Sequence, residues 1–147
     1  MGVSFENSAQ NMKEANIQTL FGAWLKDNWY SSAAFELKLC KGTSLAFDAI
    51  APHQIVGLKA VKDKGLYHKI SDNPWIKDRP SFTHPKPFDA FVLKGQAFVC
   101  ICWYVVRKKK IVYAIDIDTF LSLKKSAGRK SLTEEMARDA ATFEVNL

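Results

Sequence analysis

The chain has 147 residues, of which 48% are hydrophobic and 24% are charged, which excludes a disordered chain and leaves room for a core. The formal net charge at pH 7 is +6, a basic balance that is typical of proteins that bind the phosphate backbone of nucleic acids. No apolar run approaches the roughly 18 residues of a membrane-spanning helix, so we expect one domain over residues 1–147 and no membrane partner.

The first half of the chain alternates between helix and strand patterns. Apolar residues at helical spacing predict a helix over residues 8–27, and an apolar run with alternating charges predicts a strand over residues 33–41. Pro52 suits the first turn of a second helix, which we expect to run to Lys64 because Gly65 is a typical C-terminal stop.

The second half of the chain is richer in strands. A short strand over residues 66–70 leads into a proline-rich loop over residues 71–87, and long loops of this kind often carry function. We then expect strands over residues 88–93 and 97–106, joined as a hairpin at 94–96, and a strand over 111–115 after the basic turn 107–110. A helix over 117–125 follows, and a capping box at 131–134 opens a last short helix. This order predicts an α/β class with a mixed sheet flanked by helices.

The strand over residues 33–41 carries the first candidate site residues. Because side chains alternate along a strand, Glu36 and Lys38 project to one face while Phe35, Leu37 and Leu39 project to the other. A carboxylate beside an ammonium at a sheet edge can hold a divalent cation and orient a water. The same spacing also occurs on ordinary solvated strand faces, so its weight depends on the motifs that follow it.

Four short motifs in this order resemble the RecU-type Holliday junction resolvases of the PD-(D/E)xK nuclease superfamily. They are the E-x-K strand at Phe35-Glu36-Leu37-Lys38, a His-Gln pair that opens a helix at His53-Gln54-Ile55, a core strand at Phe98-Val99-Cys100-Ile101, and a G-R-K-S segment at Gly128-Arg129-Lys130-Ser131-Leu132. Their shared order and spacing, over residues 33 to about 132, are more specific than any one of them.

The resemblance implies a restriction-endonuclease-like fold, Mg²⁺-dependent cleavage (with Mn²⁺ as an alternative ion), branched DNA as the substrate and a homodimer. It assigns Glu36 as a metal ligand, Lys38 as the lysine near the attacking water, and Gln54 as their neighbour in the active site. Glu6, before or within the first helix, is a further candidate metal ligand, because the superfamily often has an acidic residue there.

The chain departs from the family pattern just before the E-x-K strand, where the family has an Asp on a preceding strand. Here Asp27 lies too close to the end of the first helix to occupy a paired strand. We hypothesise that Asp89, at the start of the strand over residues 88–93, supplies the missing carboxylate from a hairpin with the core strand. Asp72 is the second candidate. Either residue could instead be an ordinary turn or cap aspartate.

The basic residues are candidates for contacts with DNA phosphates, which position a nucleic acid without reading its bases. These candidates are Lys41, Arg107, Lys108, Lys109, Arg129 and Lys130. The cluster at 107–110 is equally consistent with a solubilising turn. The alternatives to a resolvase are a nicking, restriction-like or repair nuclease of the same fold, and a catalytically decayed DNA-binding module.

The three cysteines form no C-x-x-C pair, so the sequence does not predict a zinc site. Cys100 and Cys102 lie in an apolar run and are expected to be reduced core thiols. The N-terminal residues lack a basic region followed by an apolar stretch. Together these features predict a cytoplasmic protein.

Overall fold

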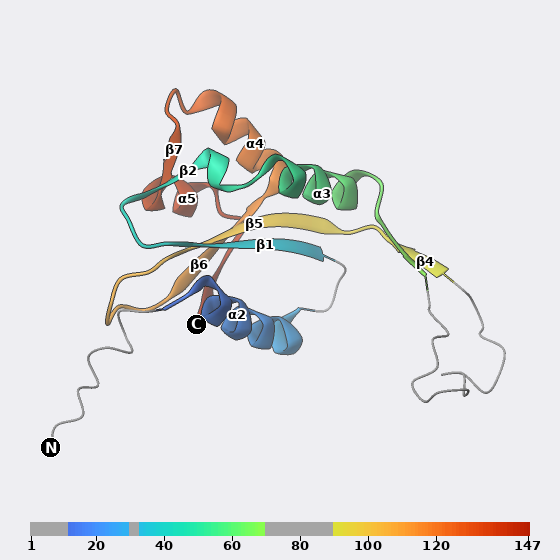
Figure 1. Ribbon diagram of the computed structural model, residues 1–147, viewed down its shortest axis with the longest axis horizontal. Coiled ribbons are helices and arrows are strands. Elements are labelled where there is room, and N and C mark those ends of the chain that lie inside the picture. The colour runs from blue at the N-terminus through green and yellow to red at the C-terminus, as the bar shows by residue number, and fades with distance from the viewer. Residues whose placement is uncertain (1–11, 30–32, 70–89) are drawn as a thin grey trace, which may run out of the picture.

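The computed structural model describes residues 12–29, 33–69 and 90–147 (Figure 1). Its centre is a four-stranded sheet in the order β1-β5-β6-β8. The strands are β1 (Ala33–Cys40), β5 (Gln96–Trp103), β6 (Ile111–Asp116) and β8 (Phe143–Asn146). β1 and β5 run parallel, whereas β6 is antiparallel to both β5 and β8. The sheet is therefore mixed, as the order of the elements predicts.

Helices flank the sheet on both faces (Figure 1). α2 (Glu14–Asn28) covers one face, and the other face is covered by α3 (Pro52–Asp63), α4 (Ile117–Ser126) and α5 (Glu134–Ala140). This arrangement confirms the predicted α/β class. Within the described ranges, no helix combines the length and the apolar character needed to cross a membrane.

β5 is the centre of the core because both of its faces are buried. Phe98, Cys100 and Cys102 pack on the side of α2, together with Ile17 and Phe21. The alternate residues, Val99, Ile101 and Trp103, pack on the side of α3, α4 and α5. The period of two along β5 thus produces two apolar layers, one on each side of the sheet. Cys100 and Cys102 are buried and free, as predicted, and Cys40 is buried and free as well.

Two short ladders accompany the central sheet. β2 (Ser44–Ala46) pairs antiparallel with β7 (Ser131–Thr133), and the 3₁₀ turn η1 (Phe47–Ala49) follows β2. β3 (Leu66–Lys69) pairs antiparallel with β4 (Ala90–Leu93). Figure 1 shows this second ribbon at one end of the sheet, opposite the turn that joins β5 to β6.

The predicted hairpin between residues 88–93 and 97–106 is wrong. β4 pairs with β3, and β5 takes β1 and β6 as its neighbours. The reason is burial: every residue of β5 after Gln96 is buried, so this strand needs an apolar neighbour on each side. β4 carries the exposed Val92 and pairs instead with the equally exposed Tyr67 on β3.

Three local predictions also need correction. The first helix begins at Glu14 and not at Ser8 or nearby, because Met12 and Lys13 are not helical and the Lys13 N–H donates to the side chain of Asn16. The last helix is capped by Thr133, whose hydroxyl accepts from the Met136 N–H, and Ser131 belongs to β7. The third correction concerns the strands, since β8 and the short β2 and β7 were not predicted.

Candidate functional site

Glu36 and Lys38 occupy one face of β1, the face toward α3, as their spacing predicts. Glu36 Oε1 lies 3.1 Å from Lys38 Nζ, and their side chains are 25% and 18% exposed. Their neighbours on the same face, Ala34 and Cys40, belong to the core layer beneath α3. The two charged side chains therefore lie at the margin of the core, still open to solvent.

Gln54 completes this group from the amino end of α3. Its Nε2 donates to Glu36 Oε1 at 2.6 Å, while its Oε1 accepts from the Ala51 N–H at 2.9 Å. Ala51 precedes Pro52, so Gln54 is the third residue of the helix and reaches back to cap its first turn. The cap fixes which end of the amide faces Glu36, and the amino end of α3 also favours an anion there. The predicted neighbours Glu36, Lys38 and Gln54 therefore lie together.

The outer edge of β1 has no partner strand among the described residues, because β1 ends the order of the sheet. The Leu39 N–H at this edge donates instead to Glu14 Oε2 of α2, at 3.3 Å. Glu14 thus accepts a hydrogen bond from a backbone group that would otherwise be unpaired at the edge of the sheet. Sequence reasoning placed no site role on Glu14; its only signal was an acidic residue in the helix before the E-x-K strand.

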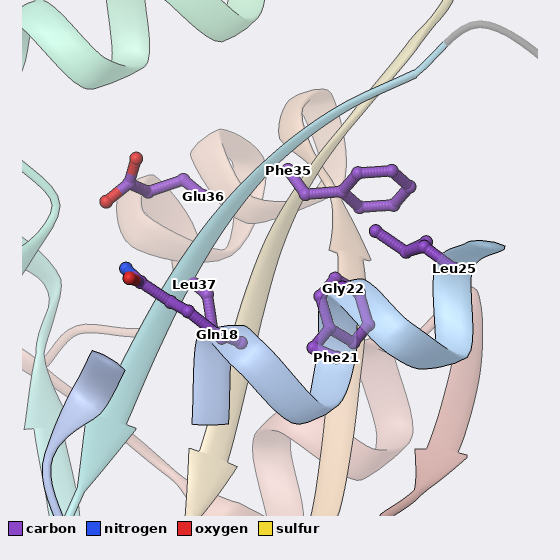
Figure 2. Close-up of a pocket in the computed structure, with 7 residues that line it drawn as sticks. All are labelled: Gln18, Phe21, Gly22, Leu25, Phe35, Glu36 and Leu37. Atoms are coloured by element: carbon purple, nitrogen blue, oxygen red, sulfur yellow. The ribbon is translucent and has the colours of Figure 1, made fainter. Parts of the chain in front are cut away.

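A cavity of about 310 Å³ lies between α2 and this edge of β1 (Figure 2). Its walls are largely apolar, and its polar lining residues are Gln18 and Glu36. Figure 2 shows the amide of Gln18 and the carboxylate of Glu36 extending past β1 on the same side, away from Phe35 and Leu25. The carboxylate is therefore reachable from the α2 side as well as from α3.

The remaining predicted acids do not complete the site in the part of the chain that is described. Glu6, Asp72 and Asp89 lie outside the described residues, so their roles stay predictions. The hairpin that was to bring Asp89 to the core strand is wrong, since β4 pairs with β3. Asp27 lies in the last turn of α2, as expected, and not on a strand.

Magnesium is usually bound by one or two carboxylates together with waters and substrate phosphates. In this group Glu36 is the single carboxylate, and its Oε1 already faces Lys38 and Gln54. Within residues 12–29, 33–69 and 90–147, no three His, Cys, Asp or Glu side chains gather closely enough to hold an ion. The described residues alone do not fit a magnesium site.

The predicted DNA-contacting residues fall into two groups. Lys41 follows β1, and Arg107, Lys108 and Lys109 are exposed in the turn after β5, which the structure confirms as a turn. Arg129 and Lys130 lie beside β7 and line a cavity of about 230 Å³ with Phe47, Asp48 and Lys124. Lys124 Nζ donates to Asp48 Oδ1 at 2.7 Å and lowers the pKa of that carboxyl.

A second ionic cluster, joining α3 to α4, is structural. Lys62 Nζ lies 2.7 Å from both Asp116 and Asp118, and Lys59 Nζ lies 2.7 Å from Asp118. Hydrogen bonds from these two lysines lower the pKa of Asp118. Hydrogen bonds to Asp118 and Asp63 raise the pKa of Lys59, and hydrogen bonds to Asp116 and Asp118 raise the pKa of Lys62. The cluster holds the two helices together beside the core.

Burial also sets the chemistry of the core thiols. It raises the pKa of Cys102 to about 11 and raises that of Cys100 further. Neither thiol is therefore a nucleophile near neutral pH.

Comparisons of the chain with protein-family models, with curated proteins and with solved structures find no match.

Proposed function

We propose that the protein is a DNA endonuclease with a restriction-endonuclease-like fold, that it resembles the RecU-type resolvases, and that it cuts branched DNA. The observation that carries the proposal is the convergence of Glu36, Lys38 and Gln54. Glu36 and Lys38 belong to one predicted motif, and Gln54 belongs to another motif at least 16 positions further along the chain. Lys38 Nζ and Gln54 Nε2 nevertheless both lie within hydrogen-bonding distance of Glu36 Oε1.

Each of the three side chains has a distinct task in phosphodiester hydrolysis. Lys38 attracts a phosphate oxygen and offsets the charge that builds on it as water attacks the phosphorus. Glu36 accepts a proton from that water as its oxygen bonds to the phosphorus, the P–O bond to the leaving oxygen breaks, and the leaving oxygen takes a proton from solvent. Gln54 positions the Glu36 carboxylate. A Mg²⁺ requirement remains part of the proposal and needs an additional acid beyond those described.

Cleavage of an end-labelled four-way junction tests this proposal. The wild type should cut the junction in Mg²⁺ and not in EDTA, and it should cut a matched linear duplex more slowly. Glu36→Gln and Lys38→Ala should abolish cutting, whereas Glu144→Gln, which changes an exposed carboxylate on β8, should not. Equal cutting of junction and duplex would favour a nicking, restriction-like or repair nuclease.

A second candidate is a DNA-binding module that has lost catalysis. The observation that favours it is the single carboxylate in the described group, already paired with Lys38. Such a module would bind the junction with salt-dependent affinity and leave it intact in Mg²⁺ or Mn²⁺.

The proposal also includes a symmetric homodimer, because a four-way junction has two equivalent strands to cut. Sedimentation equilibrium with and without junction DNA tests this part separately. A single monomeric species in both cases would contradict it.

A further inference from the structure

The turn after β5 and the helix α5 enclose a third cavity, of about 420 Å³. It is lined by Trp103, Val105, Lys108, Lys109, Ile111, Glu134 and Arg138. Of these, Lys108 and Lys109 belong to the basic turn, while Trp103 and Arg138 carried no predicted role.

The charge of the lining favours an anion. Three cationic side chains and one carboxylate leave an excess of two positive charges. Glu134 is already engaged, since its Oε1 accepts from the Tyr113 hydroxyl at 3.0 Å and lies 3.9 Å from Arg138 Nη2. Lys108 and Lys109 are exposed and form no ion pair with a described residue.

Trp103, which lines the cavity, also carries an unsatisfied hydrogen-bond donor. The side chain is 6% exposed, and its Nε1 has no hydrogen-bond partner among the described residues. A buried donor without a partner costs free energy and calls for an acceptor such as a bound anion or an ordered water.

The cavity lies on the same side of the sheet as Glu36 and Lys38. Trp103 pairs with Cys40, four residues beyond Glu36, which corresponds to an offset of about 13 Å along the strand. Successive phosphates of one strand advance about 3.4 Å along a duplex. A phosphate in the cavity would thus belong to a nucleotide several steps from the one beside Glu36.

We infer that the cavity between the β5–β6 turn and α5 binds a backbone phosphate of DNA, held by Lys108, Lys109 and Arg138. This inference rests on the proposed function for its ligand, but it concerns binding and not cleavage. It assigns Lys108 and Lys109 of the basic turn to a defined binding site, to which Arg138 and Trp103 also belong.

The test compares two double variants of equal charge, Lys108→Gln with Lys109→Gln and, as the control, Lys26→Gln with Lys64→Gln. All four lysines are exposed, so both proteins should fold like the wild type. The measurement is the affinity for four-way junction DNA by fluorescence anisotropy at several salt concentrations. The cavity variant should reduce the slope of log K against log salt by about one to two, and the control by much less.

Trp103 supplies an independent signal. DNA binding should change the tryptophan fluorescence of the wild type, and Trp103→Phe should remove most of that change. Arg138→Lys should bind DNA better than Arg138→Gln, because it keeps the charge. Equal salt slopes for the two double variants, or a fluorescence change that survives Trp103→Phe, would overturn the inference.

Cleavage assayed in the same samples separates this inference from the proposed function. Binding without cutting would refute the endonuclease proposal and leave the salt slopes to decide on the cavity. If cutting depends on Glu36 but the salt slopes of the two double variants are equal, the phosphate-binding role of the cavity would be refuted and the endonuclease proposal would stand. An absence of DNA binding would overturn both.

Discussion

Gln54 forms two hydrogen bonds, one through each end of its side-chain amide, so the orientation of the amide that allows one bond also allows the other. The bond from the Ala51 N–H to Oε1 leaves the amide nitrogen toward Glu36. Gln54→Ala removes both bonds, so we expect a loss of about 1 kcal/mol in the free energy of unfolding. Urea unfolding measures it, with His53→Ala, at an exposed neighbour, as the control. An unchanged stability would show that these bonds contribute nothing.

Asp118 should make the free energy of unfolding decrease at acidic pH. Lysine hydrogen bonds hold its pKa below 3.8, so its contribution is present above that pH and is lost as the pH falls through the folded-state value. The side chain is 49% exposed, so the effect is modest and weakens in salt.

Asp118→Asn should therefore lower the free energy of unfolding at pH 7 and flatten its decline as the pH falls below about 4. Urea unfolding across this range, beside Asp139→Asn at an exposed site of α5, measures the difference. Identical pH profiles for wild type and Asp118→Asn would contradict the assignment.

At the residue scale, the sequence was sufficient to predict the positions of side chains that follow the repeat of a strand or the start of a helix. Glu36 and Lys38 share a face because of the strand repeat, and Gln54 meets them because a Gln at the third helical position turns back to the helix start. Glu14 was missed because its contact with the Leu39 N–H joins two segments far apart in the chain, and Arg138 because it lies over the ring of Tyr113 on another element; no local pattern encodes either contact.

At the element scale, the pairing of β3 with β4 is the feature that most changes the sequence-based interpretation. Tyr67 and Val92 face each other in register, and both are exposed. Opposed residues of antiparallel strands lie about 4.5–5.5 Å apart between Cα atoms, within the range of a disulfide.

The double variant Tyr67→Cys with Val92→Cys should therefore form an intramolecular disulfide on mild oxidation. The natural cysteines are buried and should not compete. Mass spectrometry of peptides from the oxidised monomer detects the link, and each single variant is a control. A reduced double variant would count against this pairing.

The helices α3 and α4 and the strands β1, β3 and β6 were predictable because their apolar periods and caps are local. The β4–β5 error has a physical cause. A three-residue connection favours a hairpin locally, but β5 gains more by entering the centre of the sheet, where two apolar strands cover its backbone. The short β2, β7 and β8 exist only through tertiary pairing and leave little trace in sequence.

At the scale of the whole molecule, the sequence predicts an α/β protein with a mixed sheet but not the order of its strands. That order places β1 at an edge, with Glu36 open to solvent, α3 above it and α2 beside it. The pairing of β1 with β5 brings Lys41 and the basic turn 107–110 to the same end of the sheet, and the Glu36 side chain stays 25% exposed at the edge.

The central claim is that Glu36 acts on DNA and does not merely hold Lys38 in place. The most direct measurement is single-turnover cutting of a four-way junction in Mg²⁺, at protein concentrations that saturate binding for both the wild type and Glu36→Gln. We predict equal saturation and a cutting rate at least about 100-fold lower in the variant. Equal cutting rates in the two saturated complexes would contradict the account.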